Sequence, residues 1–245
     1  MHPKIAEYHI QMKAIVFISP IVGLPPSLLG SFNALAKRGI IIEGIDIFEG
    51  QHVAKSSWKI LGLTALPGAN ARRIAFANAY DEPKFFTVLR ERIAALKARG
   101  AGEIILGGMS GGFIFAARQI AESPDAAVKG LFGVSPLIFY PPGVFQKSAD
   151  LEKIPAGMPV VLVWGDGDTI VPAGTVAYAE RLAKDRANIR TRVIRGPEAG
   201  AKEGKLAHQF FGGKDFVGKM KNVFWNAAAE KIALGEIERL IDSIL

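Results

Sequence analysis

The sequence contains no cysteine, which excludes disulfide frameworks, thiolate-bound metals and a cysteine nucleophile. It also lacks a long apolar run. Residues 14–36 carry no charge, but three prolines interrupt them, and the uninterrupted stretch 14–18 is much shorter than a signal-peptide core or a membrane span. Glu7 also lies where a leader is positively charged. We therefore expect a cytoplasmic protein without stable membrane insertion.

A clustered charge of one sign is also missing. Thirty Lys and Arg accompany 23 Asp and Glu, for a formal net charge of +7. The densest basic group, Lys214, Lys219 and Lys221, includes acidic Asp215, and there is no helix-turn-helix, zinc or RNP-like pattern. This favours a solvated surface over a nucleic-acid-binding face. The 245 residues, 49% of them hydrophobic, predict one domain, 1–245, with an N-terminal extension over 1–12.

Short β-branched apolar runs alternate along the chain with longer segments of helical period. The runs are 14–19, 40–47, 103–107, 129–134, 160–164 and 189–194. The helical segments are 27–37, 82–99, 112–122, 172–185 and 222–245. This order predicts an α/β fold in which a mostly parallel sheet is covered by helices on both faces. The amphipathic stretch 226–245 fits packing either on the sheet or on a second copy in a homo-oligomer.

Two stretches, 49–80 and 135–158, do not follow the alternation and are predicted as long loops. The second leaves the strand run 129–134 and can extend as a small lid over Ser110, which follows the neighbouring run 103–107. Its residues Leu137, Phe139 and Tyr140, together with Met109, are predicted to line an apolar pocket. A surface loop that packs its own apolar residues explains the pattern equally well.

A serine lies on a Gly-rich turn between a predicted strand and a predicted helix. Gly108-x-Ser110-x-Gly112 follows the strand run 103–107 directly and opens the helix over 112–122. A nucleophile on so tight a turn adopts strained backbone angles, and the flanking positions need glycine so that strand and helix can approach. An ordinary Gly-rich turn fits the pentapeptide equally well, so other segments must decide between the two.

A candidate acid and a candidate base follow later strands. Asp166 and Asp168 come after the run 160–164, and either can serve as the acid or simply cap a turn. Of the four histidines, two lie in the N-terminal extension, which leaves His52 and His208 as candidate bases. His208 gives the chain order Ser, Asp, His that accompanies a nucleophile on a strand-to-helix turn.

These residues resemble the α/β-hydrolase superfamily, and within it the compact dienelactone-hydrolase-like enzymes and small carboxylesterases. Residues 108–112 match the family's G-x-S-x-G, residues 165–172 resemble its G-x-x-D-x-x-V-P, and 208–210 resemble its H-x-F. The resemblance covers nearly the whole chain. It implies a triad of Ser110, Asp168 and His208, and it selects Asp168 over Asp166.

The chain departs from this family at two points. Ser19-Pro20-Ile21 stands where the family usually has His-Gly, and Pro20 has no N–H. The oxyanion hole would then use the backbone N–H groups of Gly111 and Ile21. Dienelactone hydrolases use a cysteine nucleophile, so their substrate does not carry over.

The resemblance implies a serine hydrolase that cleaves a carboxylic ester or thioester through an acyl-serine intermediate. With the pocket predicted above, we expect a short or medium acyl chain or a compact ester. No cofactor or metal is expected. The same triad also serves acyl transfer and perhydrolysis, and the fold does not distinguish between these reactions. The alternative is a ligand-binding protein on an α/β-hydrolase scaffold with little turnover.

Overall fold

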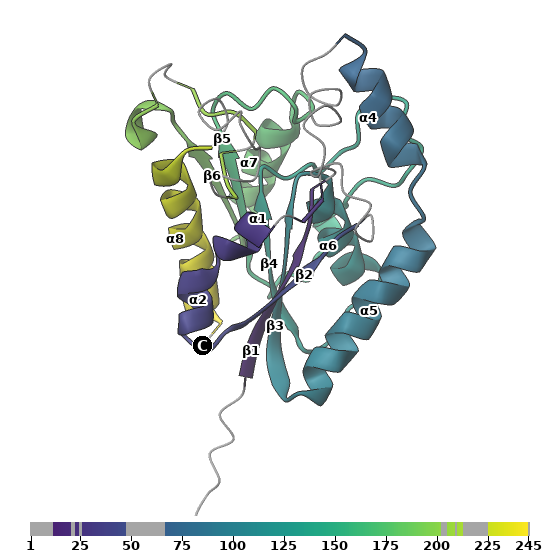
Figure 1. Cartoon of the computed structure of the whole chain (residues 1–245), viewed down its shortest axis with the longest axis vertical. Helices are drawn as coiled ribbons and strands as arrows, with labels where there is room; N and C mark the ends of the chain where they lie inside the picture. Colours follow the sequence, from purple (N-terminus) through teal and green to yellow (C-terminus); the bar gives the residue numbers. More distant parts are fainter. Residues whose placement is uncertain are drawn as a thin grey trace, which may run out of the picture.

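The computed structural model describes residues 12–20, 23–24, 26–47, 67–201, 205–208, 210–212 and 225–244. Its centre is a six-stranded parallel sheet in the order β2-β1-β3-β4-β5-β6 (Figure 1). The strands are β1 (Met12–Ile18), β2 (Ile41–Ile45), β3 (Ala101–Met109), β4 (Val128–Val134), β5 (Val160–Gly165) and β6 (Ile189–Ile194). The sheet and its helices confirm the predicted α/β class.

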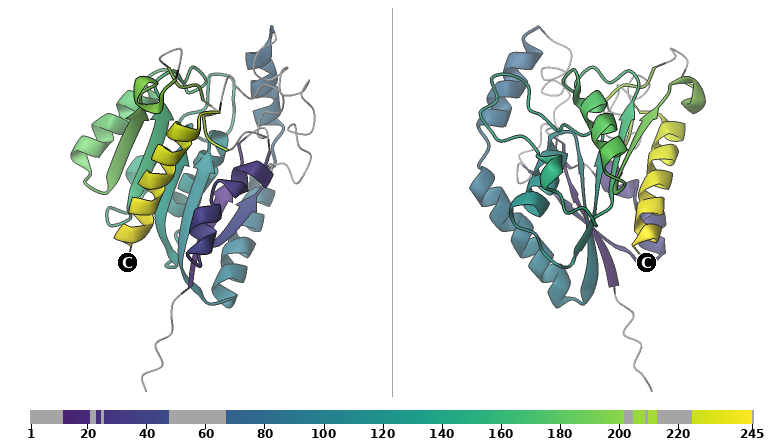
Figure 2. Two further views of the ribbon diagram at one scale, coloured as in Figure 1. Left: turned by 60° about the vertical axis from the view of Figure 1, so that its left-hand side comes forward. Right: turned by 180° about the vertical axis from the view of Figure 1, so that it is seen from behind.

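Helices cover both faces of the sheet, as Figure 2 shows. One layer contains α5 (Glu82–Ala98), α6 (Gly111–Glu122) and α7 (Thr175–Asp185). The other contains α1 (Pro26–Gly30), α2 (Asn33–Lys37) and α8 (Ala227–Ser243). The remaining elements are α4 (Ala69–Asn78) and the short 3-10 helices η2 (Leu151–Lys153) and η3 (Pro197–Ala199).

The central strands are apolar on both sides because both of their faces are buried. In β1, Ala14 and Val16 pack towards α5 and α6, whereas Ile15 and Phe17 pack towards α1, α2 and α8. α8 lies on this second face, against β4 and β5, so 226–245 takes the first of its two predicted placements. None of the described helices is long and apolar enough to cross a membrane.

Several helices differ from the prediction in their bounds. The segment 27–37 forms α1 and α2, with a turn at Ser31 and Phe32 between them. The predicted loop 49–80 contains α4. α7 begins only at Thr175, after Gly174 at φ 85°. α8 begins after Asn226, whose side chain accepts a hydrogen bond from Ala229 N and caps the helix. Most of the N-terminal extension 1–12 lies outside the described residues.

Candidate active site

Ser110 occupies the turn between β3 and α6, as predicted. Its backbone has φ 55° and ψ −127°, angles that a residue with a side chain rarely adopts. A Cβ on Gly108 would lie 2.4 Å from Phe113 N, and one on Gly112 would lie 2.4 Å from Ser19 O. The two glycines therefore allow the close approach of strand and helix that this turn needs.

The backbone of Ser110 is anchored on both sides. Its N–H donates to Val134 O at 3.1 Å, which ties the turn to the neighbouring strand β4. Its carbonyl accepts from Leu137 N at 3.1 Å and from Phe113 N at 3.2 Å. The segment that leaves β4 thus passes directly beside the serine.

Asp168 and His208 form a buried pair. His208 Nδ1 lies 2.7 Å from Asp168 Oδ2, and the two side chains are 6% and 3% exposed. The other carboxylate oxygen, Oδ1, accepts from the N–H groups of Ile170 at 3.0 Å and Val171 at 3.2 Å. An Nδ1–H that donates to Asp168 leaves Nε2 of His208 with a lone pair that can accept a proton.

Ser110 and the His208–Asp168 pair lie at the same edge of the sheet. Ser110 follows β3 and Asp168 follows β5, with β4 between these strands, so both lie at the carboxyl edge of the sheet (Figure 1). No hydrogen bond joins Ser110 to His208 among the described residues. In structures without substrate such contacts are often long, and they tighten when substrate binds.

The structure describes one of the two predicted oxyanion donors. Gly111 is the first residue of α6, so its N–H has no acceptor within the helix. Ile21 lies outside the described residues. The residue before Pro20 is placed: Ser19 O lies against Gly112, and Ser19 Oγ accepts from Ile47 N at 3.1 Å. The end of β1 therefore runs beside the start of α6.

The structure does not bring the four predicted pocket residues together, because Met109 packs on the opposite face of the sheet from the other three. Met109 is fully buried against the α8 side of the sheet. Leu137, Phe139 and Tyr140 are partly buried against the opposite face, where the Phe139 ring centroid lies 5.0 Å from that of Tyr178. The Tyr140 hydroxyl donates to Gln146 Oε1 at 3.3 Å, and burial raises the pKa of Tyr140.

The predicted lid segment 135–158 is tied to two helices. Asn78, at the end of α4, donates to Gly143 O at 2.9 Å and accepts from Phe145 N at 2.9 Å. Arg118, on α6, donates to Lys147 O at 3.4 Å. The Phe145 side chain itself is 91% exposed.

Two residues at this edge have features that the sequence reading missed. Ser135, directly after β4, has φ 44°, is fully buried, and its Oγ has no hydrogen-bond partner among the described residues. Asp166, the rejected candidate acid, accepts two backbone hydrogen bonds, from Gly196 N and Leu206 N. The sequence could have pointed to Ser135, because it directly follows a predicted strand, as Ser110 does. For Asp166 the signal was the alternation Gly-Asp-Gly-Asp.

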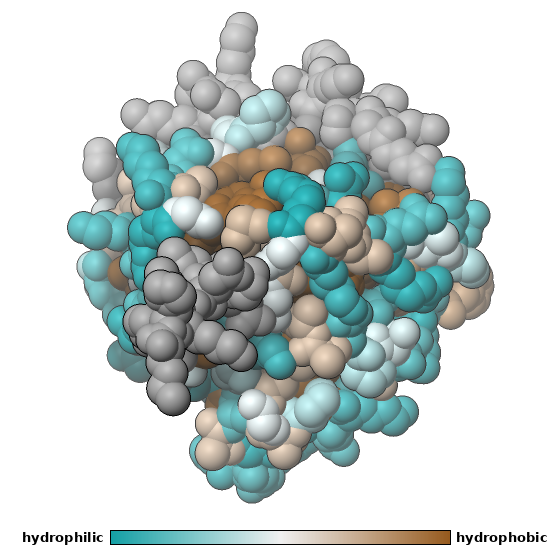
Figure 3. All heavy atoms as spheres, turned by 90° about the horizontal axis from the view of Figure 1, so that it is seen from below, coloured by the Kyte–Doolittle hydropathy of each residue, from teal (hydrophilic) through white to brown (hydrophobic). Residues whose placement is uncertain are grey.

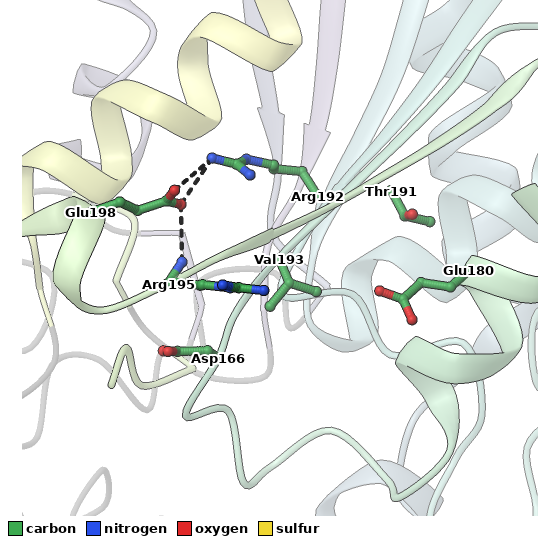
Figure 4. A pocket seen from close by; sticks show the side chains of 7 residues that line it. All are labelled: Asp166, Glu180, Thr191, Arg192, Val193, Arg195 and Glu198. Atoms are coloured by element: carbon green, nitrogen blue, oxygen red, sulfur yellow. Dashed lines mark hydrogen bonds and ion pairs between the residues drawn. The ribbon is translucent and has the colours of Figure 1, made fainter. Parts of the chain in front are cut away.

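A polar hollow of about 600 Å³ lies beside β6. Figure 4 shows Asp166 on one side of it, with Glu198 joined to Arg192 and to the backbone of Arg195. Its lining residues are Asp166, Glu180, Thr191, Arg192, Val193, Arg195 and Glu198. The hollow thus adjoins the loop that carries Asp168, and it shares no residue with the predicted acyl pocket.

No family model matches the sequence, and no curated protein matches it. Among solved structures, a protein of Klebsiella pneumoniae subsp. pneumoniae assigned as a dienelactone hydrolase is 14% identical with a TM-score of 0.64, over 95% of this chain and 87% of its own. A dienelactone hydrolase-like promiscuous phosphotriesterase from metagenomic libraries is 15% identical with a TM-score of 0.57, over 95% and 86%. A carboxylesterase of the thaumarchaeon Nitrososphaera gargenis is 14% identical with a TM-score of 0.55, over 95% and 92%.

At these identities the likeness concerns the fold. The chain has the α/β-hydrolase fold, which confirms the fold that the resemblance implied. The similar structures are those of hydrolases, including esterases and a thioesterase domain.

Proposed function

We propose that this protein is a serine hydrolase that cleaves a carboxylic ester or thioester with Ser110, His208 and Asp168. The observation that carries the proposal is the strained backbone of Ser110 between β3 and α6, at the same sheet edge as the buried His208–Asp168 pair. Strain of this kind persists where the surrounding structure holds a residue in a functional conformation.

In the proposed reaction, His208 Nε2 takes the proton of Ser110 Oγ as that oxygen attacks the acyl carbonyl. Asp168 holds the imidazole in the tautomer that accepts at Nε2, and it stabilises the imidazolium that forms. The acyl–oxygen or acyl–sulfur bond then breaks, and His208 returns the proton to the leaving alcohol or thiol. Water attacks the acyl-serine with His208 again as base, which releases the acid and restores Ser110.

The negative oxygen formed during attack needs backbone donors. Gly111 supplies one N–H at the positive end of α6, and Ile21 is proposed to supply the second. Loss of one such donor typically lowers the rate about 10²- to 10³-fold.

We propose that Leu137, Phe139 and Tyr140 contribute to the acyl pocket, and that it favours short or medium acyl chains. Met109 is left out because it is fully buried on the opposite face of the sheet. The support is that the segment 135–158 starts beside Ser110 and is attached to α4 and α6. In an ester series from acetyl to palmitoyl, kcat/KM should fall for the long chains. A flat or rising series would contradict this pocket.

The first test is labelling with a fluorophosphonate probe followed by mass spectrometry of the modified peptide. Wild-type protein should be labelled at Ser110, and both Ser110→Ala and His208→Ala should lose the label. Ser123→Ala, at the opposite end of α6, is the matched control and should be labelled like the wild type. Folded wild-type protein without label would contradict the proposal and favour the ligand-binding alternative.

A further inference from the structure

Asp166 holds together two segments that follow it at a distance in the chain. Its Oδ1 accepts from Leu206 N at 2.8 Å, and its Oδ2 accepts from Gly196 N at 3.1 Å. These partners lie 40 and 30 residues further along the chain. Leu206 is two residues before His208, so Asp166 and Asp168 bind the same short segment at two points.

The glycines beside Asp166 allow this segment to approach. A Cβ on Gly165 would lie 2.6 Å from Leu206 O, and one on Gly167 would lie 2.8 Å from Lys205 Cβ. Gly167 N also donates to Leu206 O at 2.9 Å. Residues 165–168 therefore form a cradle, here called the 165–168 cradle, in which glycines give space and aspartates give hydrogen bonds.

We propose that Asp166 is a positioning residue for His208, an inference that rests on the proposed hydrolase function. Asp168 alone fixes one ring nitrogen of His208, and a single hydrogen bond leaves the ring free to move with its backbone. Asp166 fixes that backbone at Leu206 and ties it to the end of β6 through Gly196. The ring is thus held both through its side chain and through its chain segment.

The position of the His208 ring matters because proton transfer depends on where its Nε2 atom lies. A displacement of about 1 Å can lower an enzymatic rate about 10²-fold. No hydrogen bond joins Asp166 to Ser110 or His208 among the described residues, so Asp166 acts through the segment 205–208. Its loss should therefore lower kcat and leave KM nearly unchanged.

Two substitutions of Asp166 separate its two hydrogen bonds. Asp166→Asn keeps one acceptor, and kcat on a short-chain ester should fall about 10-fold; Asp166→Ala keeps none, and kcat should fall about 100-fold, with KM within about twofold. Glu198→Gln is the matched control, because Glu198 borders the same hollow but accepts from the backbone of Arg195, which does not belong to the segment 205–208 (Figure 4). This control should keep kcat within about twofold of the wild type.

Two further measurements do not depend on turnover. The downfield proton resonance of His208 Nδ1–H, identified by its loss in Asp168→Asn, should broaden or vanish in Asp166→Ala and persist in Glu198→Gln. The amide of Leu206 should also exchange faster with solvent in Asp166→Ala.

An unchanged resonance and unchanged kcat in Asp166→Ala would overturn the positioning role, as would an equal loss in Glu198→Gln. If Asp166→Ala does not fold, Asp166→Asn decides by the same criteria. If wild-type protein neither labels nor turns over ester, the proposed function fails, whereas the resonance and exchange measurements still test whether Asp166 holds His208.

Discussion

Ser110 and Ser135 are the two non-glycine residues with positive φ in the described part of the chain, at 55° and 44°. They directly follow β3 and β4, which are neighbours in the sheet. A side chain in this region of backbone space costs about 1–2 kcal/mol, and structures tolerate it mainly where it serves a purpose. The strain in this protein is therefore concentrated at the edge that carries the candidate site.

The glycines around Ser110 should differ sharply in their tolerance of alanine. Gly112→Ala places a methyl group 2.4 Å from Ser19 O, so strand and helix must separate, and the free energy of unfolding should fall by about 2–4 kcal/mol. Gly111→Ala meets no atom within 4 Å and should change it by less than about 0.5 kcal/mol. Urea denaturation of the two variants measures the difference. Equal stabilities would contradict the steric account of the turn.

Ser135→Gly should stabilise the protein, which is unusual for a fully buried residue. The change removes the strain at φ 44° and a buried hydroxyl without a partner, so the free energy of unfolding should rise by about 1 kcal/mol. Ser19→Gly is the matched control, since Ser19 is also fully buried after a strand but its Oγ accepts from Ile47 N. That variant should be less stable than wild type by about 1 kcal/mol. Thermal unfolding of both variants measures these changes. If neither variant is more stable than the wild type, the strain argument is refuted.

At the residue scale, the sequence predicted the positions of residues that are marked by their neighbours in the chain. Ser110 was found from its place between a strand and a helix, and the structure places it on that turn. The pairing of His208 with Asp168 was reached through chain order and resemblance. The hydrogen bonds of Asp166 could not be predicted, because their partners are backbone N–H groups 30 and 40 residues away and carry no side-chain signature.

At the scale of elements, strands were predicted more reliably than helices. Each of the six apolar runs overlaps a strand. The signal is clearest in the central strands, because both of their faces are buried and need apolar residues. α4 was missed because its sequence lacks an apolar stripe and follows a Pro-Gly turn. Its last residue, Asn78, is instead fixed by Gly143 and Phe145, contacts that a local pattern does not reveal.

Arg118 joins α6 to α5 and should matter for stability. It is 7% exposed, pairs with Glu82 on α5 and with Glu122 on α6, and lies over the ring of Phe86. Arg118→Ala leaves Glu82 without this partner, so the free energy of unfolding should fall by about 2–4 kcal/mol. Arg90→Ala, at an exposed position of α5, should change it by less than about 0.5 kcal/mol. Similar urea midpoints for the two variants would show that the Arg118 cluster contributes little.

At the scale of the whole molecule, some of the ion pairs lie at the end opposite the candidate site. Figure 3 views this end, where β1 begins, and shows mainly hydrophilic residues with apolar ones gathered towards one side. Three ion pairs lie at this end: Lys13–Glu103, Lys97–Asp125 and Arg38–Asp242. Exposed pairs of this kind contribute little individually, so the fold depends chiefly on its two apolar layers.

Acid should destabilise the protein through two carboxylates in particular. Burial pushes the pKa of Glu122 upward, but hydrogen bonds from Arg118 and Lys147 outweigh it and hold the pKa below its ordinary 4.5. Burial likewise opposes the hydrogen bond from Lys97, which holds the pKa of Asp125 below 3.8. A lowered folded pKa contributes stability that is complete above the unfolded value and is lost as the pH falls through the folded one.

Urea midpoints should therefore fall between about pH 5 and about pH 2, and the decline should be shallower in the double variant Glu122→Gln, Asp125→Asn. Lys129→Gln, an exposed change without a carboxylate, is the control and should follow the wild-type decline. An equally steep decline in the double variant would assign acid sensitivity to other groups.

The 165–168 cradle also determines how late in protein synthesis the candidate site can be completed. β1 pairs with β3 as well as with β2, so the centre of the sheet cannot close until the ribosome has made residue 109. The backbone partners of Ser110, Val134 and Leu137, are made next, so the turn of Ser110 can form before Asp168 and His208 have been made. In the proposed triad, His208 can reach Ser110 only when the segment 205–208 docks, among the last steps of long-range assembly. Partly made chains would therefore carry Ser110 without its proposed base.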